Sequence, residues 1–210
     1  MERDLSHFEI LIRNPMLSSI VETVMLQTKN GATVDTIISN DTPFGISSNP
    51  RSSKKTPLDV FTTSTAEHDV LLYHVENNKR KVEYVRRKDI TKNESDIDTY
   101  KVFIPGSGDD NIVLGKSEYA PPHPVCSQSF LYAKFSTEKE AQNFILYLKT
   151  KFFRALVAAI KISQAAPNKV YQFLPLQDFS VSWTDAKLYS KYLLSDSQTQ
   201  YIETMYRKLD

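Results

Sequence analysis

The chain has 210 residues, with 26 Lys or Arg against 25 Asp or Glu, so its formal net charge is +1. A hydrophobic share of 40% with 24% charged residues is ordinary for a globular protein and excludes disorder throughout. Near-neutrality argues against a uniformly basic nucleic-acid coat, and the single cysteine, Cys126, excludes an intramolecular disulfide framework and a cysteine-based zinc site.

The N-terminal quarter predicts a helix followed by a long polar loop. Pro15 suits a first helical turn, and Asn30-Gly31 ends the helix because glycine accepts the positive φ of a helix end. Between them, the apolar residues at helical spacing are Leu17, Ile20, Val21, Val24 and Met25. A short second helix is expected around residues 34–38. The loop over 39–57 is long for a connection, which is typical of functional segments.

The middle of the chain predicts strands. Residues 70–75 and 82–85 are rich in Val, Leu and Tyr and flank Asn77-Asn78, a pattern that indicates a hairpin. Further strands are expected at 100–104 and 130–135. The proline-rich segment 121–124 predicts a rigid connector, since proline cannot continue a strand ladder.

The last third predicts helices. A capping-box pattern opens at Ser136-Thr137, and apolar residues then keep helical spacing, which predicts one long amphipathic helix over about 137–163. Residues 170–176 are expected to be extended, and small C-terminal helices follow Thr184 and Ser195. The fold class is therefore α+β, with a mixed or antiparallel sheet in the middle. We expect a single domain over 1–210, with a subdivision into a helical and loop part (1–57) and an α+β core (58–210) as the alternative.

No sequence motif predicts catalysis or metal binding. Gly106-Ser107-Gly108 lacks the following helix of a dinucleotide-binding loop, and the carboxylates of the polar loops have no EF-hand spacing. Cys126 and His123 are a weak local pair, so a hydrolase is the last-ranked hypothesis. The longest apolar stretch, 152–162, contains Arg154 and is too short to span a bilayer, and no signal peptide is present. We therefore expect a soluble, cytoplasmic protein without a membrane partner.

Basic residues are concentrated around the predicted hairpin. Residues 79–92 contain seven Lys or Arg and two acids, a local net charge of +5, and the preceding polar loop adds three more cations. A basic hairpin beside a basic loop favours contacts with the phosphates of nucleic acid, and a solvated strand face is the alternative. The candidate DNA-binding residues are Arg51, Lys54, Lys55, Lys79, Arg80, Lys81, Arg86, Arg87 and Lys88. C-terminal tyrosines at helical spacing are expected to pack in the core or an interface.

Several segments occur in an order that resembles a known family. These are Lys101-Val102-Phe103-Ile104-Pro105, Leu114-Gly115-Lys116, the run from Tyr147 to Arg154, the run from Val170 to Ser180, and Trp183-Thr184-Asp185, with Pro43-Phe44-Gly45 upstream. The chain resembles the C-terminal target-recognition region of adenine-specific DNA methyltransferases of type II and combined restriction-modification systems. The resemblance covers nearly the whole chain, and departs from the family mainly between Gly106 and Gln128.

The resemblance implies double-stranded DNA as partner and an upstream methyltransferase module, in cis or in trans. S-adenosylmethionine is implied for the parent enzyme and no cofactor for this chain, because Asn49-Pro50 is followed by Arg51-Ser52 and the Asn/Asp-Pro-Pro-Tyr/Phe motif is absent. No catalytic residue is therefore assigned. A protein-interaction or scaffold domain without DNA binding is the alternative function.

Overall fold

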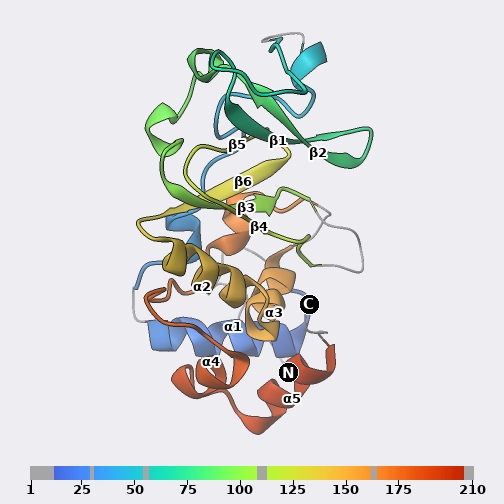
Figure 1. The fold of residues 1–210 in the computed structure, drawn as a ribbon. Helices are drawn as coiled ribbons and strands as arrows, with labels where there is room; N and C mark the ends of the chain where they lie inside the picture. The colour runs from blue at the N-terminus through green and yellow to red at the C-terminus, as the bar shows by residue number, and fades with distance from the viewer. Residues whose placement is uncertain (1–11, 29–30, 54–56, 108–112, 162–164, 206–210) are drawn as a thin grey trace.

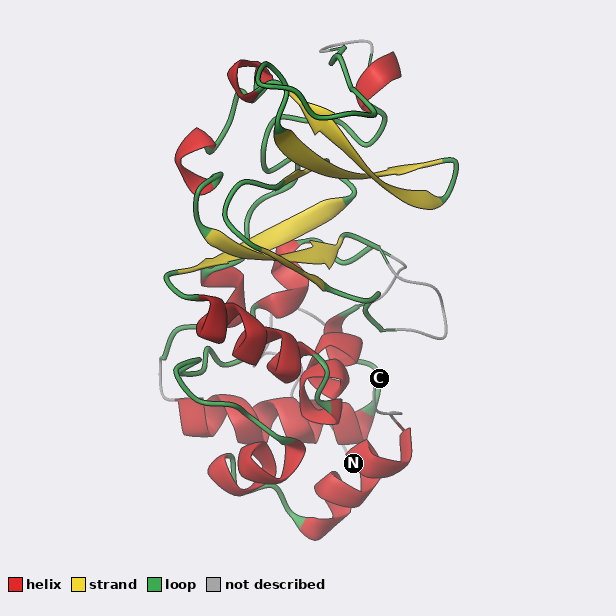
Figure 2. Cartoon of the chain, viewed as in Figure 1, coloured by secondary structure: helices red, strands yellow, loops and turns green. Residues whose placement is uncertain are grey.

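The computed structural model describes residues 12–28, 31–53, 57–107, 113–161 and 165–205. Strands occupy one end of the molecule and the longer helices occupy the other (Figures 1 and 2). The strands are β1 (Val70–Glu76), β2 (Lys79–Val85), β3 (Tyr100–Pro105), β4 (Glu118–Ala120), β5 (Val125–Cys126) and β6 (Phe130–Phe135). The α-helices are α1 (Pro15–Thr28), α2 (Glu138–Leu148), α3 (Lys151–Ile160), α4 (Asp185–Lys191) and α5 (Asp196–Met205). The α+β class is confirmed.

The strands form two sheets within the described residues. In the first, of order β2-β1-β5, β1 and β2 are the predicted hairpin and β5 pairs with β1 in parallel. The second, of order β4-β3-β6, is antiparallel. The sequence had no signal strong enough to predict the short strands β4 and β5.

The second sheet is a middle layer that is buried on both faces. Along β3, Val102 and Ile104 pack toward the helices, whereas Phe103 packs toward the first sheet. Along β6, Leu131 packs toward the helices and Tyr132 packs toward the first sheet. Successive side chains of a strand point to opposite faces, so a sheet covered on both sides needs nearly continuous apolar residues. The described residues between Ile12 and Ile46 contribute to both hydrophobic clusters, and the single domain and its subdivision at 57/58 stay predictions.

The single long helix predicted over about 137–163 is wrong: the described residues form two helices. α2 ends at Leu148, and Thr150 adopts an extended conformation with ψ of 147° before α3 begins. The Thr150 hydroxyl accepts a hydrogen bond from the Phe153 amide, which is an N-cap interaction that starts a new helix. The helical spacing of apolar residues continues across Thr150, so the sequence pattern gave no sign of the break.

Other local expectations need smaller corrections. The second helix around 34–38 is a single 3₁₀ turn, Val34–Thr36. Residues 170–176 are not simply extended, because a 3₁₀ helix covers Asn168–Tyr171. The N- and C-terminal segments meet in the helical part, where Asn14 donates a hydrogen bond to the Tyr201 hydroxyl at 2.8 Å.

Candidate nucleic-acid interface

The β1–β2 hairpin projects sideways from the sheet part of the molecule (Figure 1). The strands pair up to Glu76 opposite Lys79, which leaves Asn77 and Asn78 as the turn. The φ angles of Asn77 and Asn78 are 51° and 60°. Two consecutive positive φ values are typical of a type I′ turn, in which asparagine is among the favoured residues. The tip is therefore a tight turn.

The hairpin is anchored at its base and exposed at its tip. Val70, Leu72 and Val85 at the base are fully buried. At the other end, the exposed residues are Asn77, Asn78, Lys79 and Arg80. Burial continues along the strands to His74 and Glu83, and beyond them the tip presents amide and cationic side chains to the surroundings.

Arg80 is fixed against the neighbouring sheet. The guanidinium pairs with the Glu118 carboxylate of β4, and Nη2 donates to the Lys116 carbonyl oxygen at 2.8 Å. The guanidinium carbon also lies 5.6 Å from the centroid of the Phe130 ring, a cation–π distance. Lys79, next to it, has no ion pair with any described residue. The tip therefore combines one oriented arginine with one lysine whose charge is not paired there.

Arg51 joins the polar loop to the middle of the hairpin. Its Nη1 and Nη2 donate to the two Glu83 carboxylate oxygens at 3.0 and 2.7 Å, and Glu83 also contacts the buried His74 Nε2 at 2.7 Å. The hydrogen bond from Arg51 holds the Glu83 pKa below its usual value. Glu76 pairs with both Arg51 and Lys81, and the Lys81 hydrogen bond lowers the Glu76 pKa.

Arg86 and Arg87 fasten loops beyond the base of the hairpin. Arg86 pairs with Asp59 at 2.8 Å, and Arg87 pairs with Asp98 at 2.7 Å. The hydrogen bond from Arg87 lowers the Asp98 pKa. Arg86 also contacts Asp89 at 3.5 Å. The local charge of +5 along the sequence is thus largely compensated in space, because most of these carboxylates come from outside residues 79–92.

The predicted cations consequently separate into two groups. Arg51 and Lys81 lie along the hairpin that presents Lys79 and Arg80, whereas Arg86, Arg87 and Lys88 lie beyond its base. A cavity of about 430 Å³ is lined by Arg86 and Lys88. Lys88 has no ion pair among the described residues. The remaining two candidates, Lys54 and Lys55, lie outside the part of the chain that the structure describes.

A groove of about 540 Å³ runs between the hairpin tip and the middle sheet. Its lining includes Asn78, Arg80, Gln128, Ser129 and Phe130. The sequence prediction rested on basic residues and did not identify Asn78 or Gln128 as site residues. In the sequence, Asn78 predicts only a turn. No sequence signal indicates that the segment containing Gln128 faces the hairpin. The structure brings them to one groove.

The weak hydrolase pair is not assembled as a nucleophile and base. Burial raises the Cys126 thiol pKa well above its usual value, which disfavours the reactive thiolate. His123 instead pairs with Asp69 at 3.2 Å. Among the described residues, no group of three or more His, Cys, Asp or Glu side chains is placed to hold a metal ion.

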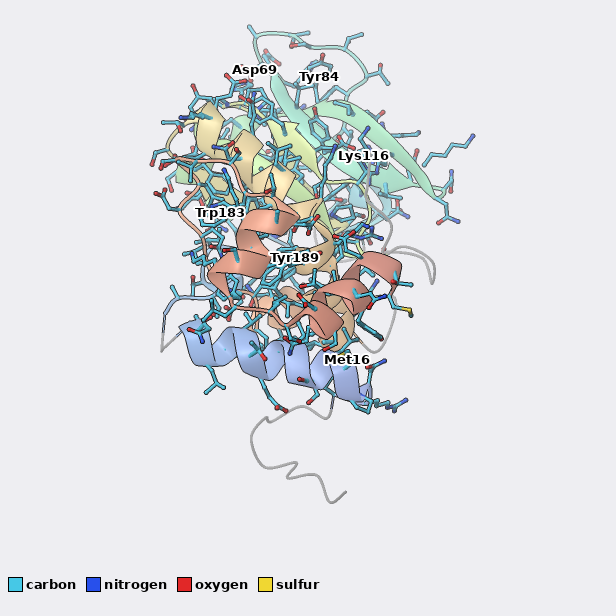
Figure 3. All side chains as sticks on the ribbon, turned by 90° about the horizontal axis from the view of Figure 1, so that it is seen from below. Met16, Asp69, Tyr84, Lys116, Trp183 and Tyr189 are labelled. Carbon is cyan, nitrogen blue, oxygen red and sulfur yellow. The ribbon has the colours of Figure 1, made fainter. Side chains whose placement is uncertain are left out.

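The C-terminal aromatics pack mainly on α3. Tyr192 is buried and stacks on Phe152 at 5.3 Å, and Tyr189 is partly buried beside the same ring. The prediction of core or interface packing is confirmed for these two. Figure 3 shows Trp183 and Tyr189 on the helical part and Lys116 on the sheet part.

Comparison with known proteins identifies no relative: no family model, no curated protein and no solved structure matches the chain. In the described part of the chain, no helix combines the length and apolar character needed to cross a membrane.

Proposed function

We propose that the chain is a sequence-specific DNA-recognition domain of an adenine-specific DNA methyltransferase from a restriction-modification system. The sequence resemblance supports the enzyme class. The structural observation that carries the proposal is the projecting β1–β2 hairpin, whose exposed tip consists of Asn77, Asn78, Lys79 and Arg80. Cations bind phosphates and amides bind base edges, so this tip has both kinds of group that recognition needs.

The dimensions of the hairpin suit the DNA major groove. That groove is about 12 Å wide and accepts a two-stranded β-ribbon. Burial extends along the strands to His74 and Glu83, so the part free of the core is the turn with Glu76, Lys79 and Arg80. It is this tip, and not the whole ribbon, that would enter the groove, which is about 8.5 Å deep.

The ion pairs give the cations defined positions. Glu118 orients the Arg80 guanidinium, and Glu83 orients that of Arg51. Both guanidinium groups are held by these pairs, and the Glu83 carboxylate is buried, so the two arginines shape the hairpin. Lys79 is available for a phosphate without breaking a pair with a described residue.

The parent enzyme would transfer the methyl group with a separate module that binds S-adenosylmethionine. Enzymes that modify a base rotate it out of the duplex, so the recognition domain has to hold the flanking duplex in register. No residue of this chain is assigned to the cofactor or to methyl transfer.

A protein-interaction domain is the second candidate function. Two observations favour it: carboxylates neutralise the arginine charges of the hairpin, and the region around α4 is exposed. There, the Lys191 ammonium lies 4.5 Å from the centroid of the partly buried Trp183 ring, and Leu193 is 69% exposed. Failure of the chain to bind duplex DNA at low salt would favour this candidate.

Removal of two lysine charges near the tip, neither of which has an ion pair with a described residue, tests the proposal. Lys79→Gln with Lys116→Gln should weaken binding to duplex DNA and reduce the slope of log K against log salt by about 2, because two counterion-releasing contacts are lost. The matched control, Lys139→Gln with Lys187→Gln, removes two exposed charges from α2 and α4 and should leave both unchanged. Arg86 and Arg87 are unsuitable for this test because their ion pairs fasten neighbouring loops.

Fluorescence anisotropy of a labelled duplex over a series of salt concentrations provides both quantities. Equal losses in the hairpin variant and the control would remove the hairpin from the DNA interface.

A further inference from the structure

The groove beside the hairpin contains two amide side chains whose hydrogen-bonding groups are free of described partners. Asn78 lines it from the hairpin tip, and Gln128 lines it from the turn between β5 and β6. Both residues are exposed. An amide carries donors and an acceptor side by side, so each of these side chains is available to a ligand that presents the complementary pair.

The other charged groups of the groove do not favour adenine. The Arg80 guanidinium is engaged with Glu118 and the Lys116 carbonyl oxygen, and Asp41 offers acceptors only. Arginine is the usual partner of guanine, whereas asparagine and glutamine make two hydrogen bonds to the N6 and N7 positions of adenine. Ser48, Ser107 and Ser129 also line the groove, but a hydroxyl does not distinguish the bases, so the two amides are the groups that favour adenine.

Both amides are carried by backbone that is held in place. Asn78 occupies a tight turn at φ 60°, closed by the pairing of Glu76 with Lys79. The backbone N–H of Gln128 donates to the Ile46 carbonyl oxygen at 2.8 Å, and the backbone N–H of the preceding Ser127 donates to the Tyr73 carbonyl oxygen of β1 at 2.9 Å. Positioned backbones reduce the entropy lost when a side chain makes a specific contact.

We propose that Asn78 and Gln128 are specificity-determining residues that read adenine bases through their amides. This assignment rests on the proposed DNA-recognition function. The phosphate contacts of Lys79 and its neighbours supply sequence-independent affinity, and the two amides supply the preference for adenine at defined positions.

The test uses the chain with a library of duplexes that contain 20 randomised base pairs, from which bound sequences are enriched. Asn78→Gly removes the amide and keeps the turn, because glycine adopts positive φ without strain. Gln128→Ala removes the second amide. Gln27→Ala removes an exposed amide from α1 and is the matched control.

Each test variant should lose the adenine preference at one position of the enriched site, by about 5- to 150-fold, and retain its salt-dependent affinity for random duplex. The control should enrich the wild-type site. If both variants also enrich the wild-type site, the amides do not read bases, although DNA recognition by the hairpin stands. If the wild-type chain binds no duplex or enriches no site, the proposed function fails and this assignment fails with it.

A modified base identifies the contacted atom. Replacing the affected adenine by 7-deazaadenine removes the N7 acceptor, so it should weaken binding of the wild-type chain and have no further effect on the variant that lacks the amide. An equal loss in both proteins would overturn the assignment.

Discussion

Lys101 is a fully buried lysine whose ammonium is enclosed by the protein backbone. Its Nζ donates to the carbonyl oxygens of Asp96, Ile97 and Thr99 at 2.9, 2.7 and 2.6 Å. Three acceptors match the three N–H groups of an ammonium. Lys101 therefore fixes the 96–99 turn, which also carries Asp98, the partner of Arg87.

The stability of the protein should depend on the titration of Lys101. Burial lowers the Lys101 pKa to about 8, against about 10.4 in an unfolded chain. Between these pH values the unfolded chain binds the extra proton, so the free energy of unfolding rises with pH. Relative to Lys101→Met, the wild type should gain up to about 3 kcal/mol from pH 8 to 10.4.

Urea denaturation of the two proteins at several pH values measures this difference. The neighbouring Cys126 thiol has a raised pKa, so it stays neutral when the lysine begins to titrate. If the difference in free energy of unfolding between the two proteins does not change with pH, the three carbonyl groups offset the effect of burial on the Lys101 pKa, which contradicts the prediction.

At the level of secondary-structure elements, the break between α2 and α3 allows the two helices to run in different directions. The buried Thr150 hydroxyl donates to the Tyr147 carbonyl oxygen at 2.7 Å and accepts from the Phe153 amide at 3.1 Å. One side chain thus satisfies the last turn of α2 and the first turn of α3. After the break, α2 packs on the middle sheet and α3 packs on α1.

Thr150→Val keeps the shape of the side chain and removes both hydrogen bonds. It should lower the free energy of unfolding by about 1–3 kcal/mol, because the buried Phe153 amide loses its partner and the Tyr147 carbonyl oxygen keeps only backbone donors. Thr204→Val removes a hydroxyl that donates to the Gln200 carbonyl oxygen on the exposed α5, and should cost less than about 0.5 kcal/mol. Equal shifts in the urea midpoint for the two variants would contradict the role given to Thr150.

At the scale of the whole molecule, local sequence patterns predicted the helices and strands better than they predicted which elements and side chains contact one another. The hairpin follows from two β-rich runs around Asn77-Asn78, and the C-terminal helices follow from their caps, since both signals are local in sequence. The break at Thr150 was concealed because a threonine inside an apolar stripe resembles a tolerated helical residue. The site was harder, because charge counted along the chain cannot show that Glu118 and Asp98 approach the arginines in space.

The same distinction applies to the groove. Asn78 and Gln128 are 50 positions apart in the sequence and line one surface only because β5 pairs with β1. The middle sheet lies between the first sheet, which carries the hairpin, and the aromatic packing of the helical part (Figure 1).

The most direct test of the central claim is a map of the DNA-binding surface by amide chemical shifts. A ¹⁵N-labelled chain titrated with duplex DNA should show its largest changes at the hairpin tip, residues 77–81, and at the side-chain amides of Asn78 and Gln128. The amides of α4 and α5 should change little. Changes centred on α4 and α5, or none at low salt, would contradict the account.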